Sequence, residues 1–124
     1  MSARVLISTV SDGTMLIPDD RSNKQVALHR RRFLEKNDIK VDQSTRVNIT
    51  YNTNHFVRYK EVDLIHNGGA GMVLDDSEPA DALITQDTGH ALFLPLADCV
   101  GAVLFDPIKH VLMLSHLGRH SVEQ

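Results

Sequence analysis

Three side chains of the sequence, one thiol and two imidazoles, are of the types that bind zinc. His55 follows the segment RVNITY, Cys99 follows ALFLPLA and Asp98, and His116 ends HVLMLSH. Rigid strands aim the loops that follow them, so functional residues favour such positions in αβ sheets. One cysteine and two histidines would also leave the fourth tetrahedral position of zinc open, as catalytic zinc sites do.

The spacing of these residues does not by itself establish a metal site. His55 and Cys99 are 44 residues apart and Cys99 and His116 are 17 apart, so no compact ligand motif is present. Spacing alone favours the plainer interpretation, in which Cys99 is a small buried hydrophobe and both histidines are ordinary loop residues. Surface or strand-end positions are expected for the remaining histidines of interest, which are His66, His90, His110 and His120.

The composition predicts one soluble domain. A length of 124 residues predicts a single domain over 1–124, and a hydrophobic content of 42% suffices for a core. The net charge of −3 and the 5% aromatic content argue against nucleic-acid binding, although residues 30–32 form a short basic cluster. A single cysteine predicts a cytoplasmic protein, and the apolar runs are too short to span a membrane.

Local patterns predict an α/β fold with a central mixed sheet and flanking helices. A helix is expected over 21–37, where apolar residues recur with a helical period. Strands are expected at 5–10, 46–51, 81–85, 91–97, 100–105 and 110–115, with a weaker extended segment at 56–64 and a turn at 67–76. The last four runs are so apolar that they are typical of strands buried on both faces.

The predicted helix alone is too little to cover such a sheet. An apolar face left bare would exceed what soluble monomers usually tolerate. We therefore expect self-association, a second chain that completes the sheet, or a longer protein of which this sequence is a stretch.

The second half of the chain resembles the YfiH family, also known as laccase-domain proteins or multicopper polyphenol oxidoreductases. The matching pieces are Ala80–Thr85, Ala97–Cys99, Asp106–Pro107 and His116–Gly118. Upstream, VALHRRRFLEKNDI resembles a helix of the same family. The resemblance implies a YfiH-like domain of which the C-terminal half is missing from this chain.

The resemblance also implies a metal and an activity. It places Zn²⁺ on His55, Cys99 and His116, in a purine nucleoside phosphorylase or adenosine deaminase type of enzyme. Purine nucleoside and phosphate are then the expected partners. Arg30 matches a family arginine that suits an anion, with the solvated face of a basic helix as the alternative. Asp98 would orient a ligand or cap a turn. Arg30 and Asp98 are thus the candidate catalytic residues.

Two further interpretations stay open. The chain departs from the family pattern at His29, at Phe56 and after Gly118, where the family tryptophan is missing. One alternative is therefore a non-catalytic half-domain that acts as a binding or assembly partner. The other is a copper-dependent polyphenol oxidoreductase, since a copper site also uses two histidines and a cysteine.

Overall fold

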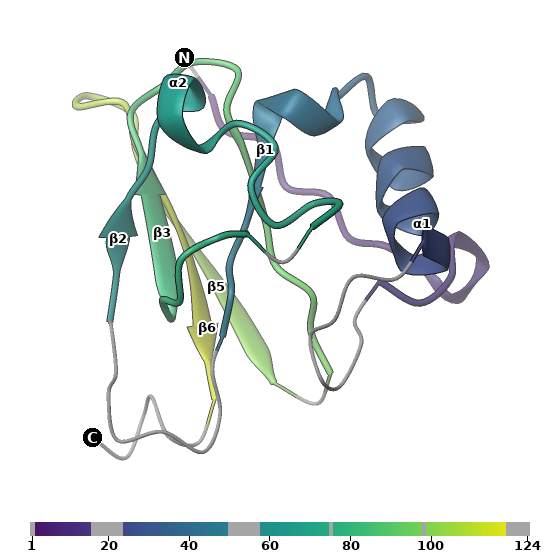
Figure 1. The fold of residues 1–124 in the computed structure, drawn as a ribbon. Coiled ribbons are helices and arrows are strands. Elements are labelled where there is room, and N and C mark those ends of the chain that lie inside the picture. The colour runs from purple at the N-terminus through teal and green to yellow at the C-terminus, as the bar shows by residue number, and fades with distance from the viewer. Residues whose placement is uncertain (1, 16–23, 50–57, 75, 98, 119–124) are drawn as a thin grey trace.

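The chain folds into a mixed α/β structure, as the sequence predicts (Figure 1). The computed structural model describes residues 2–15, 24–49, 58–74, 76–97 and 99–118. Its helices are α1 (Lys24–Glu35) and α2 (Leu64–Asn67), with 3₁₀ turns η1 (Val10–Asp12) and η2 (Val41–Gln43). Its strands are β1 (Ser44–Arg46), β2 (Lys60–Glu61), β3 (Ala82–Thr85), β4 (Ala91–Phe93), β5 (Val100–Asp106) and β6 (Val111–Leu117).

The strands form two sheets. β1 and β4 pair in parallel, while the other sheet has the order β2-β3-β6-β5. In this larger sheet β2 and β3 are parallel, and β6 is antiparallel to both β3 and β5. The longest ladder joins β5 to β6, from Val100 opposite Leu117 to Asp106 opposite Val111. This hairpin turns at Asp106, whose carboxylate accepts hydrogen bonds from the backbone N–H groups of Ile108 and Lys109.

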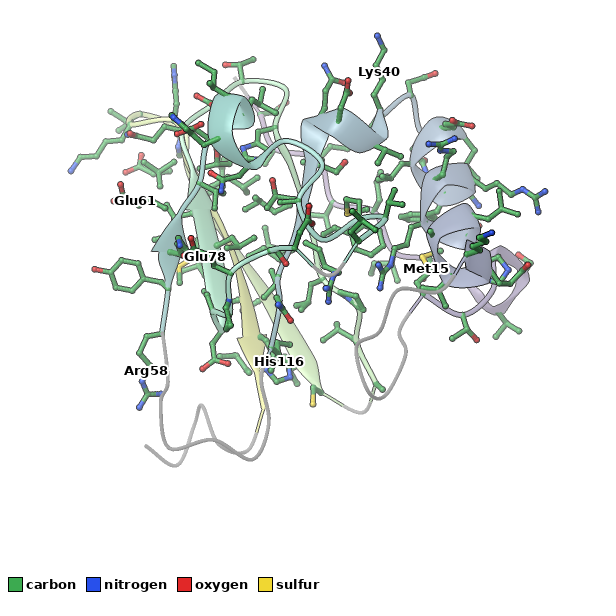
Figure 2. The ribbon with its side chains drawn as sticks, viewed as in Figure 1. Met15, Lys40, Arg58, Glu61, Glu78 and His116 are labelled. Atoms are coloured by element: carbon green, nitrogen blue, oxygen red, sulfur yellow. The ribbon has the colours of Figure 1, made fainter. Side chains whose placement is uncertain are left out.

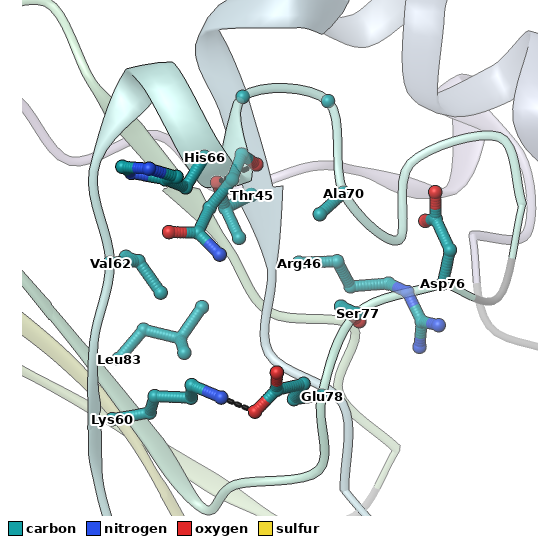
Figure 3. Close-up of a pocket in the computed structure, with 13 residues that line it drawn as sticks. Thr45, Arg46, Lys60, Val62, His66, Ala70, Asp76, Ser77, Glu78 and Leu83 are labelled. Atoms are coloured by element: carbon teal, nitrogen blue, oxygen red, sulfur yellow. Dashed lines mark hydrogen bonds and ion pairs between the residues drawn. The ribbon is translucent and has the colours of Figure 1, made fainter.

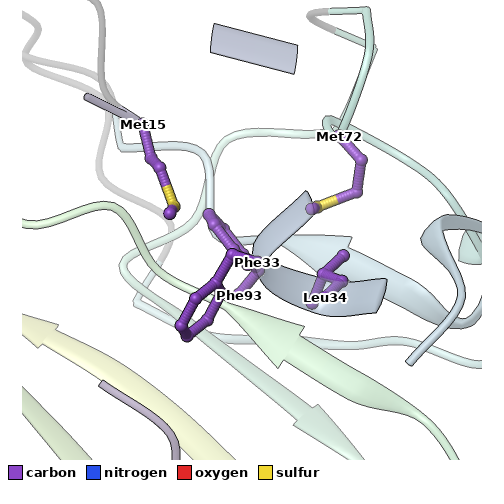
Figure 4. Packing of buried hydrophobic residues seen from close by; sticks show 5 residues of the cluster. All are labelled: Met15, Phe33, Leu34, Met72 and Phe93. Carbon is purple, nitrogen blue, oxygen red and sulfur yellow. The ribbon is translucent and has the colours of Figure 1, made fainter. Parts of the chain in front are cut away.

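Helix α1 closes one part of the core. Its buried side chains Phe33 and Leu34 pack with Met15, Met72 and Phe93 (Figure 4). Apolar residues three and four positions apart form one face of a helix, which explains why this segment is helical here. The two methionines fill this core, as flexible thioether side chains commonly do.

A second cluster joins the two sheets. Val47 lies just after β1 and packs with Val62, Ala80 and Leu83, while Leu114 of β6 lies against the same group. The register places Leu83 opposite Leu114. One face of the four-stranded sheet is therefore turned toward β1 and β4, and we call it the inner face.

Several predicted elements are shorter or absent. Residues 5–9 form no strand, and the run 91–97 pairs only over β4. The prediction of a strand at 46–51 holds only for its first residue, and residues 50 and 51 lie outside the described part. The sequence offers extended propensity at these positions, but a strand also requires a partner for its backbone groups.

The prediction that strands 100–105 and 110–115 are buried on both faces is wrong for the described structure. Most residues of β5 are exposed, and those of β6 are largely half-buried. Helix α1 lies across β1 from this hairpin and does not cover it (Figure 1). Among the described helices none is long and apolar enough to cross a membrane.

Candidate metal centre at the end of the β5–β6 hairpin

The hairpin brings Cys99 and His116 to the same end of the four-stranded sheet. Cys99 directly precedes β5, and His116 is the penultimate residue of β6. The register sets Gly101 opposite His116, so Cys99 lies only two positions from the cross-strand partner of the histidine. Residues directly opposite in an antiparallel pair have side chains on the same face. A Cβ atom on Gly101 would lie 3.1 Å from Leu96 Cδ1 and 3.3 Å from Leu94 Cδ2, so two leucine side chains pack against this glycine.

The imidazole of His116 is deeply buried at this end of the sheet. The residue is 1% exposed, and its backbone N–H donates to the Asp81 carbonyl oxygen at 2.7 Å. A Cβ atom on Gly118 would lie 2.4 Å from Cε1 of the ring, so only glycine fits at that position. Figure 2 shows His116 at the end of β6 where the strand leaves the sheet. The chain thus encloses this histidine rather than presenting it on a loop.

Cys99 is half-buried. A cysteine sulfur and a histidine nitrogen are both ligands that suit a borderline metal ion such as zinc or a copper ion. The other members of the predicted site, His55 and Asp98, lie outside the described residues. Within the described ranges no group of three histidine, cysteine, aspartate or glutamate side chains is arranged to hold a metal. The donor pair therefore fits part of the predicted site, and the complete triad stays a prediction.

Arg30, the candidate phosphate ligand, is buried and holds the backbone. Its Nε and Nη2 donate to the Met15 carbonyl oxygen at 3.0 and 2.8 Å. Its Nη1 donates to the carbonyl oxygens of Gly71 and Met72 at 3.1 and 3.3 Å. The alternative of a solvated basic face is wrong for this residue, because Arg30 is on the side of α1 that faces the core. The structural role of Arg30, binding backbone carbonyl oxygens, is thus observed, and its role in binding phosphate stays a prediction.

A second buried arginine donates a hydrogen bond to one of the carbonyl oxygens that Arg30 binds. Arg46, the last residue of β1, donates from Nε to the Gly71 carbonyl oxygen at 2.6 Å. Gly71 has φ +78°, and a Cβ atom there would lie 2.6 Å from Ser77 Oγ and 2.9 Å from Arg46 Cβ. Two buried guanidinium groups therefore fix the loop after α2, at a position that only glycine can occupy.

His90 is the titratable residue whose environment the sequence did not reveal. It directly precedes β4, so it is a strand-end histidine as expected, but it is buried rather than on the surface. Its Nε2 lies 2.7 Å from Thr45 Oγ1 and its Nδ1 lies 2.8 Å from Thr85 Oγ1. The ring therefore bridges β1 of the small sheet and β3 of the large one.

The hydrogen bonds around His90 define which nitrogen carries the proton. The Thr45 hydroxyl donates to the Asn67 carbonyl oxygen at 2.7 Å, so it must accept from Nε2. The Thr85 hydroxyl accepts from the Asp87 N–H at 3.2 Å and can donate to Nδ1. This arrangement places a proton on Nε2 and suits a neutral imidazole whose Nδ1 accepts from Thr85. Burial lowers the pKa of His90, against the opposing charges of Asp87 and Asp63.

A polar cavity of about 350 Å³ lies between β1, β2 and the loop after α2 (Figure 3). Arg46 and Lys60 supply positive charge to its lining, and Asp76 and Glu78 supply negative charge. Lys60 pairs with Glu78 across the cavity. Because both signs are present in equal number, this cavity has no evident preference for an anion. Of the residues predicted for the metal site, the two that the structure describes, Cys99 and His116, do not line this cavity.

Comparison with known proteins relates this geometry to a family. Residues 15–124 match the family described as "Multi-copper polyphenol oxidoreductase laccase". The YfiH hypothetical protein of Bacillus licheniformis has a similar structure, with a TM-score of 0.69 and 19% identity over 82% of this chain. YlmD of Geobacillus stearothermophilus gives a TM-score of 0.71 and 22% identity over 87% of this chain. The chain spans 40% and 39% of these two proteins, respectively. Comparison with curated proteins gives no match.

Proposed function

Because the chain belongs to the multi-copper polyphenol oxidoreductase laccase family, we propose that it is a metal-dependent enzyme acting on purine nucleosides. The proposed reaction is phosphorolysis of the nucleoside or deamination of adenosine, with zinc held by His55, Cys99 and His116. The observation that supports this proposal is that Cys99, just before β5, and His116, near the end of β6, lie at the same end of the β5–β6 ladder. The ladder brings two residues that are 17 positions apart in the sequence to neighbouring backbone positions.

The residues of the proposed site have separate roles. Zinc would supply Lewis acidity toward a water molecule or a substrate oxygen. Cys99 would bind as a thiolate, and the burial of His116 would hold its imidazole in one orientation. Asp98 would orient a ligand, and Arg30 would hold phosphate. Backbone carbonyl oxygens already accept hydrogen bonds from most N–H groups of the Arg30 side chain. Its contribution to the reaction would therefore be mainly indirect, by holding the backbone of the core in place.

Metal content tests the proposal directly. The full chain is loaded with Zn²⁺ or Cu²⁺, dialysed and measured by elemental analysis. We expect about one zinc per chain, and Cys99→Ala is expected to lose most of it, since two neutral imidazoles hold zinc poorly. His110→Asn is a matched control, because His110 is an exposed histidine in the turn between β5 and β6. Equal zinc in the parent and in Cys99→Ala would refute the site.

Activity is tested on the same samples. Adenosine turnover is followed with and without phosphate, which separates phosphorolysis from deamination. We expect turnover by the zinc-loaded parent and none by Cys99→Ala. A zinc-loaded parent that turns over no purine nucleoside would contradict the activity while leaving the metal site intact.

Copper is the alternative metal, favoured by the description of the family. A blue copper site also uses two histidines and a cysteine, with a weak axial ligand. Preferential retention of copper over zinc, with the intense visible absorption of a copper–thiolate bond, would support the polyphenol oxidoreductase interpretation.

A non-catalytic assembly module is the second candidate function. One observation favours it: most residues of strand β5 are exposed in the described structure. Such a module would bind a second polypeptide without turnover. The assays above distinguish the two functions, because a module has no adenosine turnover at any metal content.

A further inference from the structure

The proposed reaction leaves one buried acidic residue beside His116 without a role. Asp81 is 7% exposed, and His116 is 1% exposed. The backbone N–H of His116 donates to the Asp81 carbonyl oxygen at 2.7 Å, so the two residues lie side by side at the end of the four-stranded sheet. Acidic side chains are seldom buried so completely, because removing a charged group from water is costly. The position of Asp81 therefore calls for a specific interaction.

The register defines the face of the sheet from which the Asp81 side chain projects. The antiparallel pair of β3 and β6 begins with Ala82 opposite Ser115, so the preceding position sets Asp81 opposite His116. Directly opposite residues have side chains on the same face, with Cβ atoms about 4.5–5.5 Å apart. Leu83 is two positions further along and belongs to the cluster on the inner face. The carboxylate and the imidazole therefore both project from the inner face.

Asp81 and Cys99 flank His116 from opposite sides. Asp81 directly precedes β3, and Cys99 directly precedes β5. The strand order β3-β6-β5 places β6, which carries His116, between these two strands. The imidazole thus lies on the strand between a thiol and a carboxylate. A metal ion held from the Cys99 side would leave the Asp81 side for the second nitrogen of the ring.

We propose that Asp81 is a positioning residue of the metal site, which accepts a hydrogen bond from Nδ1–H of His116 and leaves Nε2 to bind zinc. Nδ1 is the ring nitrogen nearer the backbone, and thus nearer the residue directly across the strand pair. A histidine that binds a metal commonly donates its other ring N–H to a carboxylate, which fixes the tautomer and the orientation of the ring. In the described structure His116 Nδ1 and Asp81 Oδ2 are buried and do not bond each other, so a rotation of the ring or of the carboxylate would form this bond.

This inference rests on the proposed function, because it assigns Nε2 of His116 to zinc. A carboxylate at Nδ1 increases the basicity of the imidazole and so strengthens its bond to the metal. The proposal adds Asp81 to the predicted site and does not replace the role predicted for Asp98. Its specific consequence is that zinc affinity depends on a residue that does not itself bind zinc.

Zinc affinity of the full chain tests this consequence. Competition with a chelating dye gives the dissociation constant of the parent and of each variant. Asp81→Asn removes the charge with almost no change in size and is expected to raise this constant about 10- to 100-fold. Asp81→Glu keeps a carboxylate and should recover part of the loss. Asp106→Asn is the matched control, because Asp106 is at the opposite end of the β5–β6 hairpin, and should bind zinc as the parent does.

Nuclear magnetic resonance of isotope-labelled histidine shows which nitrogen of His116 carries the proton in the zinc-loaded parent. We expect a proton on Nδ1 that exchanges slowly with water, and faster exchange in Asp81→Asn. A residue that only stabilises the fold would leave this exchange unchanged. Circular dichroism confirms that each variant is folded, and the spectrum of the parent requires no substitution.

The outcomes separate this proposal from the proposed function. Equal zinc affinity in the parent and in folded Asp81→Asn, or zinc bound to Nδ1 of His116, would overturn the role of Asp81 and leave the zinc site intact. A parent that binds no zinc would overturn both. Zinc affinity that depends on Asp81, without turnover of any purine nucleoside, would support the role of Asp81 and contradict the proposed activity.

Discussion

The region around α1 buries its large apolar side chains, whereas the more apolar β5–β6 hairpin leaves many of its own exposed. Around α1, Leu34 and its neighbours are buried, and Arg30 ends on backbone carbonyl oxygens. In the hairpin, Leu104 and Val100 stay exposed while Cys99 and His116 meet at its end. Apolar composition alone therefore does not identify the core. Coverage by other elements decides which apolar residues are buried in the core and which stay exposed.

The largest effect is expected in the α1 region. Leu34→Ala removes a side chain that is 2% exposed and should lower the free energy of unfolding by about 2–5 kcal/mol. Ile108→Ala, an apolar truncation in the hairpin turn, should change it by less than about 0.5 kcal/mol. Urea unfolding followed by circular dichroism measures both. Equal losses in the two variants would remove the distinction between the regions.

Arg30 gives the next effect. Arg30→Lys keeps the charge but has no planar fork of donors, so it cannot donate to the carbonyl oxygens of Met15 and Met72 at the same time, whereas Gly71 keeps its bond from Arg46. We expect a loss of about 2 kcal/mol in urea unfolding. Arg31→Lys on the exposed side of α1 is the control and should be neutral. A stable Arg30→Lys protein that has lost phosphate-dependent turnover would instead support the phosphate role.

The burial of His90 between the two sheets predicts how the free energy of unfolding depends on pH. The folded pKa of His90 is lowered by burial, so the unfolded chain binds more protons as the pH falls below about 6.5. Stability is then complete above that pH and decreases below it, by at most about 1.4 kcal/mol per pH unit. Urea midpoints from pH 8 to pH 5 measure this slope.

Two variants test whether His90 causes this pH dependence of stability. His90→Gln should lower stability at neutral pH and flatten the pH dependence, because the amide does not titrate. His110→Asn, in the exposed hairpin turn, should keep the parent slope. If His90→Gln retained the full slope, another group would be responsible.

The smallest effect is expected at the hairpin turn. Asp106→Ala removes the acceptor for the N–H groups of Ile108 and Lys109, and should lower the free energy of unfolding by about 0.5–1.5 kcal/mol. Asp106→Asn retains an acceptor oxygen and should lose less. A loss as large as that of Leu34→Ala would show that the hairpin contributes to stability as much as the α1 region.

Local signals in the sequence were sufficient for the elements with strong periodicity. The helical period around Phe33 predicts α1, and the apolar runs predict β3, β5 and β6 with the turn at Asp106–Pro107 between the last two. The family resemblance pointed to Cys99 and His116, and the strand register explains how residues 17 apart meet. The short strands β1, β2 and β4 escaped accurate prediction, because their limits depend on which neighbours pair with them.

The sequence by itself determined the helical face of α1, the apolar character of the hairpin and the family. Tertiary structure alone decided three other properties. Arg30 is buried and links distant backbone segments, because two of its carbonyl partners belong to Gly71 and Met72, which are 41 and 42 residues away. His90 became a neutral bridge because Thr45 and Thr85 come from different sheets. Most residues of β5 stayed exposed because α1 lies on the far side of β1 from this hairpin (Figure 1). Burial and hydrogen-bond partners depend on distant segments, whereas periodicity is a property of adjacent residues.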